Sequence, residues 1–254
     1  NDADFIKNHF IVFATKNGTV KKTSLEAYSR PRTNGVNAIT IADGDEVVDV
    51  RLTNGKNQLI MANRNGRAVY FDENTVRTMG RTATGVRGMR LDGGDDAVVG
   101  MIVVNNPETE TVMVVSEEGY GKRSVVEDYR LTNRGGKGVK TLNITEKTGK
   151  LVAIKNVTDE NDLMIINQSG IVIRLSVAEC RVMGRATQGV RLINLAKKND
   201  VIASVCKVMS AEMEEQVEER GHSQADQQNE NSCSNEADVA DDDNQTIPPS
   251  VDFE

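Results

Sequence analysis

Short apolar runs that lead into glycine-centred turns recur along the chain, and the clearest example covers residues 112–142. Apolar residues (VMVV) precede a turn at Gly119, a basic strand leaves this turn, and a basic glycine-rich loop ends in Gly138-Val139 and another apolar stretch. Similar segments begin at Ile11, Leu59 and Leu163. Short runs bounded by glycine turns are typical of β-hairpins. The pattern therefore predicts four hairpins.

Two sets of glycines give the same period. The turn glycines are separated by 48, 53 and 51 residues, and a second set, each followed by valine, by 50, 53 and 51. These two sets are Gly18, Gly66, Gly119 and Gly170, and Gly35, Gly85, Gly138 and Gly189. Two anchors with one period indicate repeat units of about fifty residues. We place the units near residues 11–58, 59–111, 112–162 and 163–209.

One more apolar strand is expected between successive hairpins. These strands are Glu46–Leu52, Ala97–Val104 and Leu151–Val157, and a fourth, in NDVIASVCKV, follows the last hairpin. Each unit then has about four strands and little helix, apart from short turns near residues 24–28 and 125–129. Such a unit cannot bury its apolar face alone, so the units must pack as blades around an axis. Residues 1–209 are thus predicted to be an all-β, propeller-like domain.

The apolar columns of the repeat are assigned to its core. Val36, Val86, Val139 and Val190 follow the second glycine, with Ile39, Met89, Leu142 and Ile193 three residues later. Tyr28, Val76, Tyr129 and Cys180 occupy another column, ten residues after the turn glycine. A position that accepts Tyr, Val or Cys is interpreted as a packing site, not a nucleophile.

Charge divides the chain into two unlike parts. Residues 210–254 contain 14 of the 38 acidic residues and one of the 31 basic ones, so the net charge of −7 separates into −13 here and +6 in residues 1–209. The polar, aperiodic segment is predicted to be a disordered tail. We expect it either to solvate the protein or to compete with an anionic ligand, such as a nucleic acid, for the basic residues of the first part. The positive body keeps nucleic acid open as a partner despite the acidic pI of 5.1.

Basic residues recur at three addresses of the repeat, each basic in three of four units. They lie two residues after the second glycine, four residues before it, and four residues after the turn glycine. Although Lys and Arg can simply solubilise a surface, recurrence at one address matches the periodic phosphates of bent duplex DNA. The candidate DNA-binding residues are Lys21, Lys22, Arg30, Arg32, Arg67, Arg77, Arg81, Arg87, Lys122, Arg123, Arg130, Arg134, Lys137, Lys140, Arg174, Arg185 and Arg191.

The loop Arg134-Gly135-Gly136-Lys137-Gly138 is a candidate phosphate contact through its backbone N–H groups and two cations. The alternative is a flexible inter-strand turn. It is not a nucleotide-binding P-loop, because no GK[ST] motif opens a helix. The absence of Trp and the scarcity of other aromatic residues disfavour a stacking platform for single strands. Contact with the backbone of double-stranded DNA, with little sequence specificity, is expected.

The sequence offers few groups for catalysis or metal binding. Cys180, Cys206 and Cys233 lack metal-ligand spacing, and His9 and His222 stand alone. We predict no metal site, no catalysis by this chain alone and a reduced, cytoplasmic location. No signal peptide or membrane-spanning run is visible.

Several motifs together resemble the C-terminal domain of the bacterial DNA gyrase A protein over roughly residues 11–208. They are NGTVKKT from Asn17, MGR from Met79 with TGVRG from Thr84, GYGKR from Gly119, and MGR from Met183 with QGV from Gln188. The resemblance implies a β-pinwheel, a propeller-like disc of Greek-key blades that exchange strands, with DNA wrapped around its basic outer edge. It also implies a parent heterotetramer of two gyrase A proteins with the gyrase B protein. That complex uses ATP and magnesium to introduce negative supercoils into the bacterial chromosome. No cofactor is expected in this chain itself.

Two features depart from the family pattern. The family usually has six blades, whereas four units are present here, as though the first two were missing. The family's Gln-Arg-Arg-Gly-Gly-Lys-Gly box, essential for supercoiling, is matched at five of seven positions by residues 132–138, which we interpret as a degenerate repeat of it. The cleavage tyrosine would lie outside this chain. The alternatives are the related C-terminal domain of topoisomerase IV and a protein-interaction propeller of the kelch or WD type.

Overall fold

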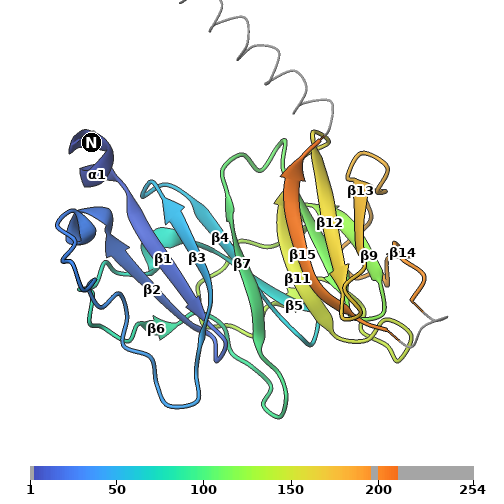
Figure 1. The fold of residues 1–254 in the computed structure, drawn as a ribbon, viewed down its shortest axis with the longest axis horizontal. Coiled ribbons are helices and arrows are strands. Elements are labelled where there is room, and N and C mark those ends of the chain that lie inside the picture. The colour runs from blue at the N-terminus through green and yellow to red at the C-terminus, as the bar shows by residue number, and fades with distance from the viewer. Residues whose placement is uncertain (1–2, 196–199, 211–254) are drawn as a thin grey trace, which may run out of the picture. The chain divides into compact units, whose positions relative to one another are not determined.

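Strands account for nearly all regular structure in residues 3–195 and 200–210, which are the residues that the computed structural model describes (Figure 1). The predicted disordered tail falls almost entirely outside them. One short helix, α1 (Ala3–Asn8), was not predicted, and it precedes the first hairpin. The expected short turns are present as 3₁₀ turns η1 (Leu25–Tyr28) and η3 (Val126–Asp128), with a third, η2 (Glu73–Thr75), in the second unit.

The described strands form four sheets, ordered β3-β1-β2-β6, β7-β4-β5-β10, β11-β8-β9-β14 and β15-β12-β13, which we call blades 1 to 4. The hairpin strands are β1 (Phe10–Thr15) and β2 (Thr19–Ser24), β4 (Gln58–Asn63) and β5 (Arg67–Asp72), β8 (Thr111–Ser116) and β9 (Tyr120–Val125), and β12 (Asn161–Asn167) and β13 (Val172–Ser176). The inner strands are β3 (Val47–Thr53), β7 (Val98–Val104), β11 (Leu151–Val157) and β15 (Ile202–Met209). The outermost strands are β6 (Val86–Arg87), β10 (Val139–Lys140) and β14 (Val190–Arg191). Both the hairpins and the inner strands are thereby confirmed.

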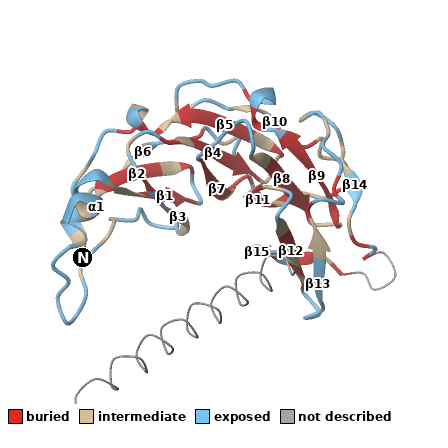
Figure 2. Cartoon of the chain, turned by 90° about the horizontal axis from the view of Figure 1, so that it is seen from above, coloured by how far each residue is buried: buried red, intermediate tan, exposed pale blue. Residues whose placement is uncertain are grey.

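The first strand of each hairpin contains an uninterrupted apolar run because blades pack on both of its faces. Successive side chains of a strand point to opposite faces. On β8, Val112 and Val114 join a buried cluster with Ile60 of blade 2, whereas Met113 and Val115 join another with Leu163 of blade 4. A run such as VMVV is therefore what a strand between two neighbouring blades requires. Figure 2 shows the buried strands at the centre of the blades.

Adjacent blades exchange strands. The short Gly-Val strand of each later unit pairs with the hairpin of the unit before it, so β6 pairs with β2, β10 with β5 and β14 with β9. The second glycine is required at this crossing. Gly138 has φ +75°, and a Cβ there would lie 2.2 Å from the carbonyl oxygen of Ala68. This exchange is the pinwheel connection that the resemblance implies.

Most of the predicted core columns are buried. Met89, Leu142 and Ile193 are at most 9% exposed, and so are Val76, Tyr129 and Cys180 of the packing column. Burial raises the pKa of Tyr129 to about 12. The valine column is only partly buried, and Val190 is exposed, because Val86, Val139 and Val190 lie on the outermost strands and Val36 lies on a loop.

No helix in the described part of the chain is long and apolar enough to cross a membrane. The same residues contain no group of three or more His, Cys, Asp or Glu side chains that could hold a metal ion.

Candidate nucleic-acid interface

The outermost strands present one cation each at the rim of the blades. Arg87, Lys140 and Arg191 occupy the second position of β6, β10 and β14, and all three are exposed. Within the described residues, none of them forms an ion pair with a carboxylate. Lys140 Nζ donates to Asn143 Oδ1 at 3.2 Å, and Arg191 Nη2 donates to the Tyr120 hydroxyl at 2.9 Å. This column is thus on the outer surface, as its charge pattern predicted.

A hydrogen bond repeated at each junction fixes the loops of neighbouring units side by side. In each case the donor is the N–H of the residue five positions after the second glycine of one unit. The acceptor is the carbonyl of the residue two positions before the second glycine of the next unit. The bonds are Thr40 N to Ala83 O at 3.3 Å, Arg90 N to Gly136 O at 2.9 Å and Asn143 N to Thr187 O at 3.0 Å. The rim loops therefore follow one another in register instead of projecting independently.

The arginines before the second glycine span these junctions. Arg134 Nη1 donates to the carbonyl of Arg87 at 2.9 Å, and Arg185 Nη1 donates in the same way to the carbonyl of Lys140 at 3.1 Å. Through Nε, each arginine also donates to the carbonyl of the last residue of a 3₁₀ turn, Thr75 of η2 for Arg134 and Asp128 of η3 for Arg185. These contacts place a half-buried arginine of one unit beside an exposed cation of the preceding unit. We call these four residues, together with Arg81 and Arg191 at the equivalent positions of other units, the outer arc: Arg81, Arg87, Arg134, Lys140, Arg185 and Arg191.

The glycine-rich loop is tied to blade 2. Gly135 N donates to Gly88 O at 2.6 Å, so this N–H is not free for a phosphate, contrary to the expectation for the loop. Lys137 forms an ion pair with Asp92 and lowers the pKa of that carboxyl. The side chain of Lys137 remains about half exposed (52%). The loop therefore offers the Lys137 side chain to a ligand, whereas the Gly135 N–H is already bonded.

Four predicted contact residues lie inside the protein, and we call them the buried basic set: Lys21, Lys22, Lys122 and Arg123. They are 0%, 2%, 1% and 8% exposed. Their predicted place on an outward rim is wrong, because β2 and β9 are covered by the next unit's strand and by neighbouring blades.

Each member of the buried basic set has an internal partner. Lys21 Nζ donates to the carbonyls of Ala38, at 2.6 Å, and Arg81, and Lys122 Nζ donates to that of Gly184. Lys22 pairs with Glu73 at 2.8 Å, and Arg123 pairs with Asp159. Burial lowers the pKa of Lys21, and it lowers that of Lys122 to about 8. These cations hold neighbouring loops, including the loops that carry Arg81 and Arg185.

Comparison with known proteins places the chain in a family. The family model of the DNA gyrase C-terminal domain, beta-propeller, matches residues 9–54, 57–105, 110–158 and 161–206. The chain belongs to this gyrase C-terminal domain family. It is 46% identical over 214 residues to the DNA gyrase A protein of Staphylococcus aureus strain MRSA252, which covers 84% of this chain and 24% of that protein. It is 48% identical over 202 residues to the same protein of strain NCTC 8325 / PS 47, covering 80% and 22%. The chain therefore spans about a quarter of the length of these relatives.

Solved structures agree on the gyrase-type fold. A crystal structure of the C-terminal domain of DNA topoisomerase IV has a TM-score of 0.75 at 29% identity, covering 82% of this chain and 64% of the other. A DNA gyrase A C-terminal domain has a TM-score of 0.71 at 24% identity, covering 82% and 69%. The predicted β-pinwheel class is confirmed. Identity to topoisomerase IV is lower than to the staphylococcal gyrase A proteins, so the topoisomerase IV alternative is not the better supported one.

The other candidates in this gyrase-family domain lie outside the outer arc. Arg30, Arg32, Arg77 and Arg130 are exposed on loops, whereas Arg67 is half-buried and donates to Gly138 O at 3.3 Å. Arg174 pairs with Asp162 at 2.7 Å. In the described residues, no Gly-Val strand pairs with β13. This strand is therefore the outer edge of the blade 4 sheet.

One exposed cation at a junction was missed from the sequence. Arg90 supplies the N–H that bonds Gly136, and its side chain is exposed beside the glycine-rich loop. The equivalent positions in other units are occupied by Thr40 and Asn143, so Arg90 does not belong to a basic column of the repeat. The signal that could have identified it is its distance of five residues from Gly85.

Proposed function

We propose that this domain binds double-stranded DNA along the outer arc and bends it, as the DNA-wrapping module of a gyrase A protein. The observation that carries the proposal is the outer arc itself, in which exposed cations recur on the outermost strands and are held in register by the repeated hydrogen bonds between loops. Phosphates follow one another at regular intervals along a duplex, so a regular series of cations can contact several at once.

The arc contacts DNA through its backbone. Exposed Arg and Lys side chains on two-residue strands offer charge to phosphates, but no helix or long ribbon in the described residues is placed to enter the major groove. The DNA sequence then affects affinity mainly through bending, because flexible base-pair steps cost less free energy to deform.

In the parent complex, this module would work with the gyrase B protein and a second gyrase A protein. There, wrapping of a positive hand would present a segment of the same DNA molecule for strand passage, which makes supercoiling directional. ATP and magnesium would be used by that complex and not by this domain, and the location would be the bacterial cytoplasm, on the chromosome. The identity to the staphylococcal gyrase A proteins supports this assignment.

A salt titration of duplex binding tests the proposal. If all six arc cations each neutralise one phosphate, the logarithm of the binding constant should fall with the logarithm of salt concentration with a slope of about −5. Fluorescence anisotropy with a labelled duplex measures this slope. A slope near zero, or no binding at low salt, would refute the proposal and favour a protein-interaction propeller.

A further inference from the structure

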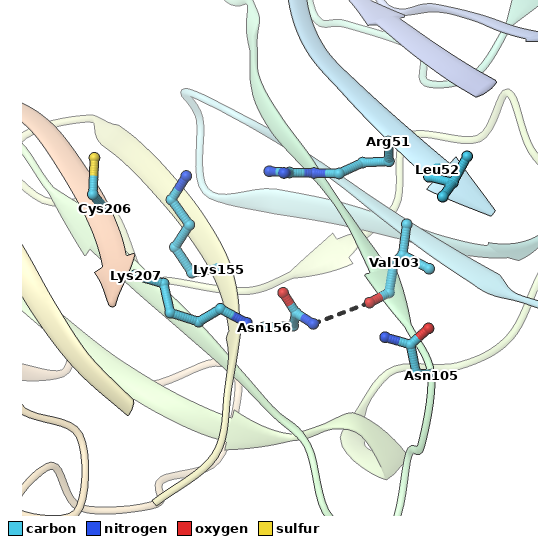
Figure 3. Close-up of a pocket in the computed structure, with 8 residues that line it drawn as sticks. All are labelled: Arg51, Leu52, Val103, Asn105, Lys155, Asn156, Cys206 and Lys207. Carbon is cyan, nitrogen blue, oxygen red and sulfur yellow. Dashed lines mark hydrogen bonds between the residues drawn. The ribbon is translucent and has the colours of Figure 1, made fainter. Parts of the chain in front are cut away.

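A basic pocket lies on the inner strands, at the edge of the blades opposite the outer arc. It is a cavity of about 420 Å³, and strands β3, β7, β11 and β15 all contribute to its lining (Figure 3). Its polar lining includes Arg51, Asn105, Lys155, Asn156 and Lys207. A cavity of this size is in the range of small-molecule sites.

Arg51 is held in place at the pocket by its own neighbours. Its Nε donates to the carbonyl of Met101 at 3.1 Å, and its Nη2 lies 3.0 Å from a carboxylate oxygen of Asp49. In Figure 3 Arg51 extends toward the ammonium end of Lys155, and Lys207 extends toward Asn156. The guanidinium is therefore oriented before any ligand arrives.

The two lysines carry the unused charge. Among the described residues, neither Lys155 nor Lys207 forms an ion pair or a side-chain hydrogen bond. Burial lowers the pKa of Lys207, the charge of Glu110 opposes this, and the charges of Arg51 and Lys155 lower it further. Three cations thus face one cavity, and the nearby carboxylates, Asp49 and Glu110, do not line it. Mutual repulsion of this kind is relieved when an anion binds between the cations.

We propose that this basic pocket binds a multiply charged phosphate anion, of the class of an inorganic or nucleoside triphosphate. Two ammonium groups and a guanidinium provide several donors for phosphate oxygens, and charge-assisted hydrogen bonds of this type are the strong ones. The site uses none of the outer-arc residues, so it is independent of the proposed DNA contact.

Isothermal titration calorimetry of the full chain with magnesium-free inorganic triphosphate and, separately, ATP tests the pocket. One binding site is expected, and Lys155→Ser and Lys207→Ser should each weaken it about tenfold. Equal affinities for the two ligands would assign recognition to the phosphates alone, and tighter binding of ATP would add the nucleoside to it. Both results support the proposal.

Two control variants remove the same charge elsewhere. Lys56→Ser changes an exposed loop lysine, and Arg87→Ser changes the outer arc. Both should bind triphosphate as the unmodified chain does, and both pocket variants should keep the unmodified melting temperature and duplex affinity. Failure of the chain to bind either ligand, unchanged binding in the pocket variants, or equal loss in a control would overturn the proposal.

Discussion

The buried basic set and the outer arc carry the same kinds of side chain at different positions of one repeat unit, but they do different work. Lys22 lies on a hairpin strand and is 2% exposed, with its ammonium 2.8 Å from the Glu73 carboxylate. Arg87 lies on a two-residue outermost strand, and its side chain is exposed. The first set joins parts of the protein, and the second remains available to a partner.

Solvent explains the difference. A buried charge needs an internal partner to offset the loss of water, so the buried basic set is committed to protein carbonyls and carboxylates. An exposed cation can replace the counterions condensed on DNA phosphates, and the release of those counterions favours binding. Substitutions in the two sets should therefore separate stability from DNA affinity.

The largest effect is expected for Lys22→Met. The change leaves the Glu73 carboxylate, which is 0% exposed, without its cation. Removing one partner of a buried ion pair costs about 3–5 kcal/mol, so the free energy of unfolding should fall by that amount. Urea denaturation measures it. The exposed control Lys56→Met should change it by less than about 0.5 kcal/mol, and an equally small change in Lys22→Met would show that the ion pair is not structural.

The complementary change is the triple variant Arg87→Ala/Lys140→Ala/Arg191→Ala. Losing about 1 kcal/mol per phosphate contact should weaken duplex binding by about 3 kcal/mol, roughly a hundredfold, and reduce the salt slope by about 3. Anisotropy titrations at several salt concentrations give both values. The matched control Lys7→Ala/Lys16→Ala/Lys56→Ala removes equal charge from other exposed positions. Similar losses in the two variants would mean that net charge, and not the arc, drives binding.

Lys122 predicts a pH dependence of stability. Its pKa is about 8 in the folded protein and ordinarily 10.5, so between these values the unfolded chain binds more protons. Stability should therefore rise with pH in this window, by on the order of 1 kcal/mol between pH 8 and pH 9.5. Lys122→Met should remove most of this rise in urea titrations across the same range. A rise of equal size in the variant would assign it to other groups.

The smallest effect is expected at Lys137, which is exposed but already paired with Asp92. Because a phosphate must compete with that carboxylate, Lys137→Ala should reduce the salt slope by less than Lys140→Ala, which should reduce it by about 1. The pKa of Asp92 should also rise toward its ordinary value of 3.8, which a carbon-detected NMR titration can follow. An unchanged pKa of Asp92 would contradict the ion pair.

The repeat could be predicted from sequence because its physical causes are local. Turn glycines, the Gly-Val pairs and the continuous apolar runs mark the hairpins and the inner strands directly. The paired glycine periods also indicated the blades. The reason for the second glycine, however, lies in the approach of its backbone to Ala68, some seventy residues away in the preceding unit, which no local pattern shows.

The orientation of the basic columns could be predicted only in part. Lys21 and Lys122 share a column with Val69 and Ile173, and Lys22 and Arg123 share one with Tyr70. The apolar residues in these columns indicated burial. The Lys and Arg residues in the same columns nevertheless led to the prediction that the columns lie on the surface. The column of Arg87 has no apolar member, and it is the one that the structure leaves exposed.

Ligation of a nicked circular plasmid in the presence of the domain tests the central claim most directly, that the outer arc bends and wraps duplex DNA. After removal of the protein, gel electrophoresis reads the change in linking number. We predict a positive shift with the unmodified chain and with the Lys7/Lys16/Lys56 control, and none with the Arg87/Lys140/Arg191 variant. DNA binding without any shift, or an equal shift from both variants, would contradict wrapping on this surface.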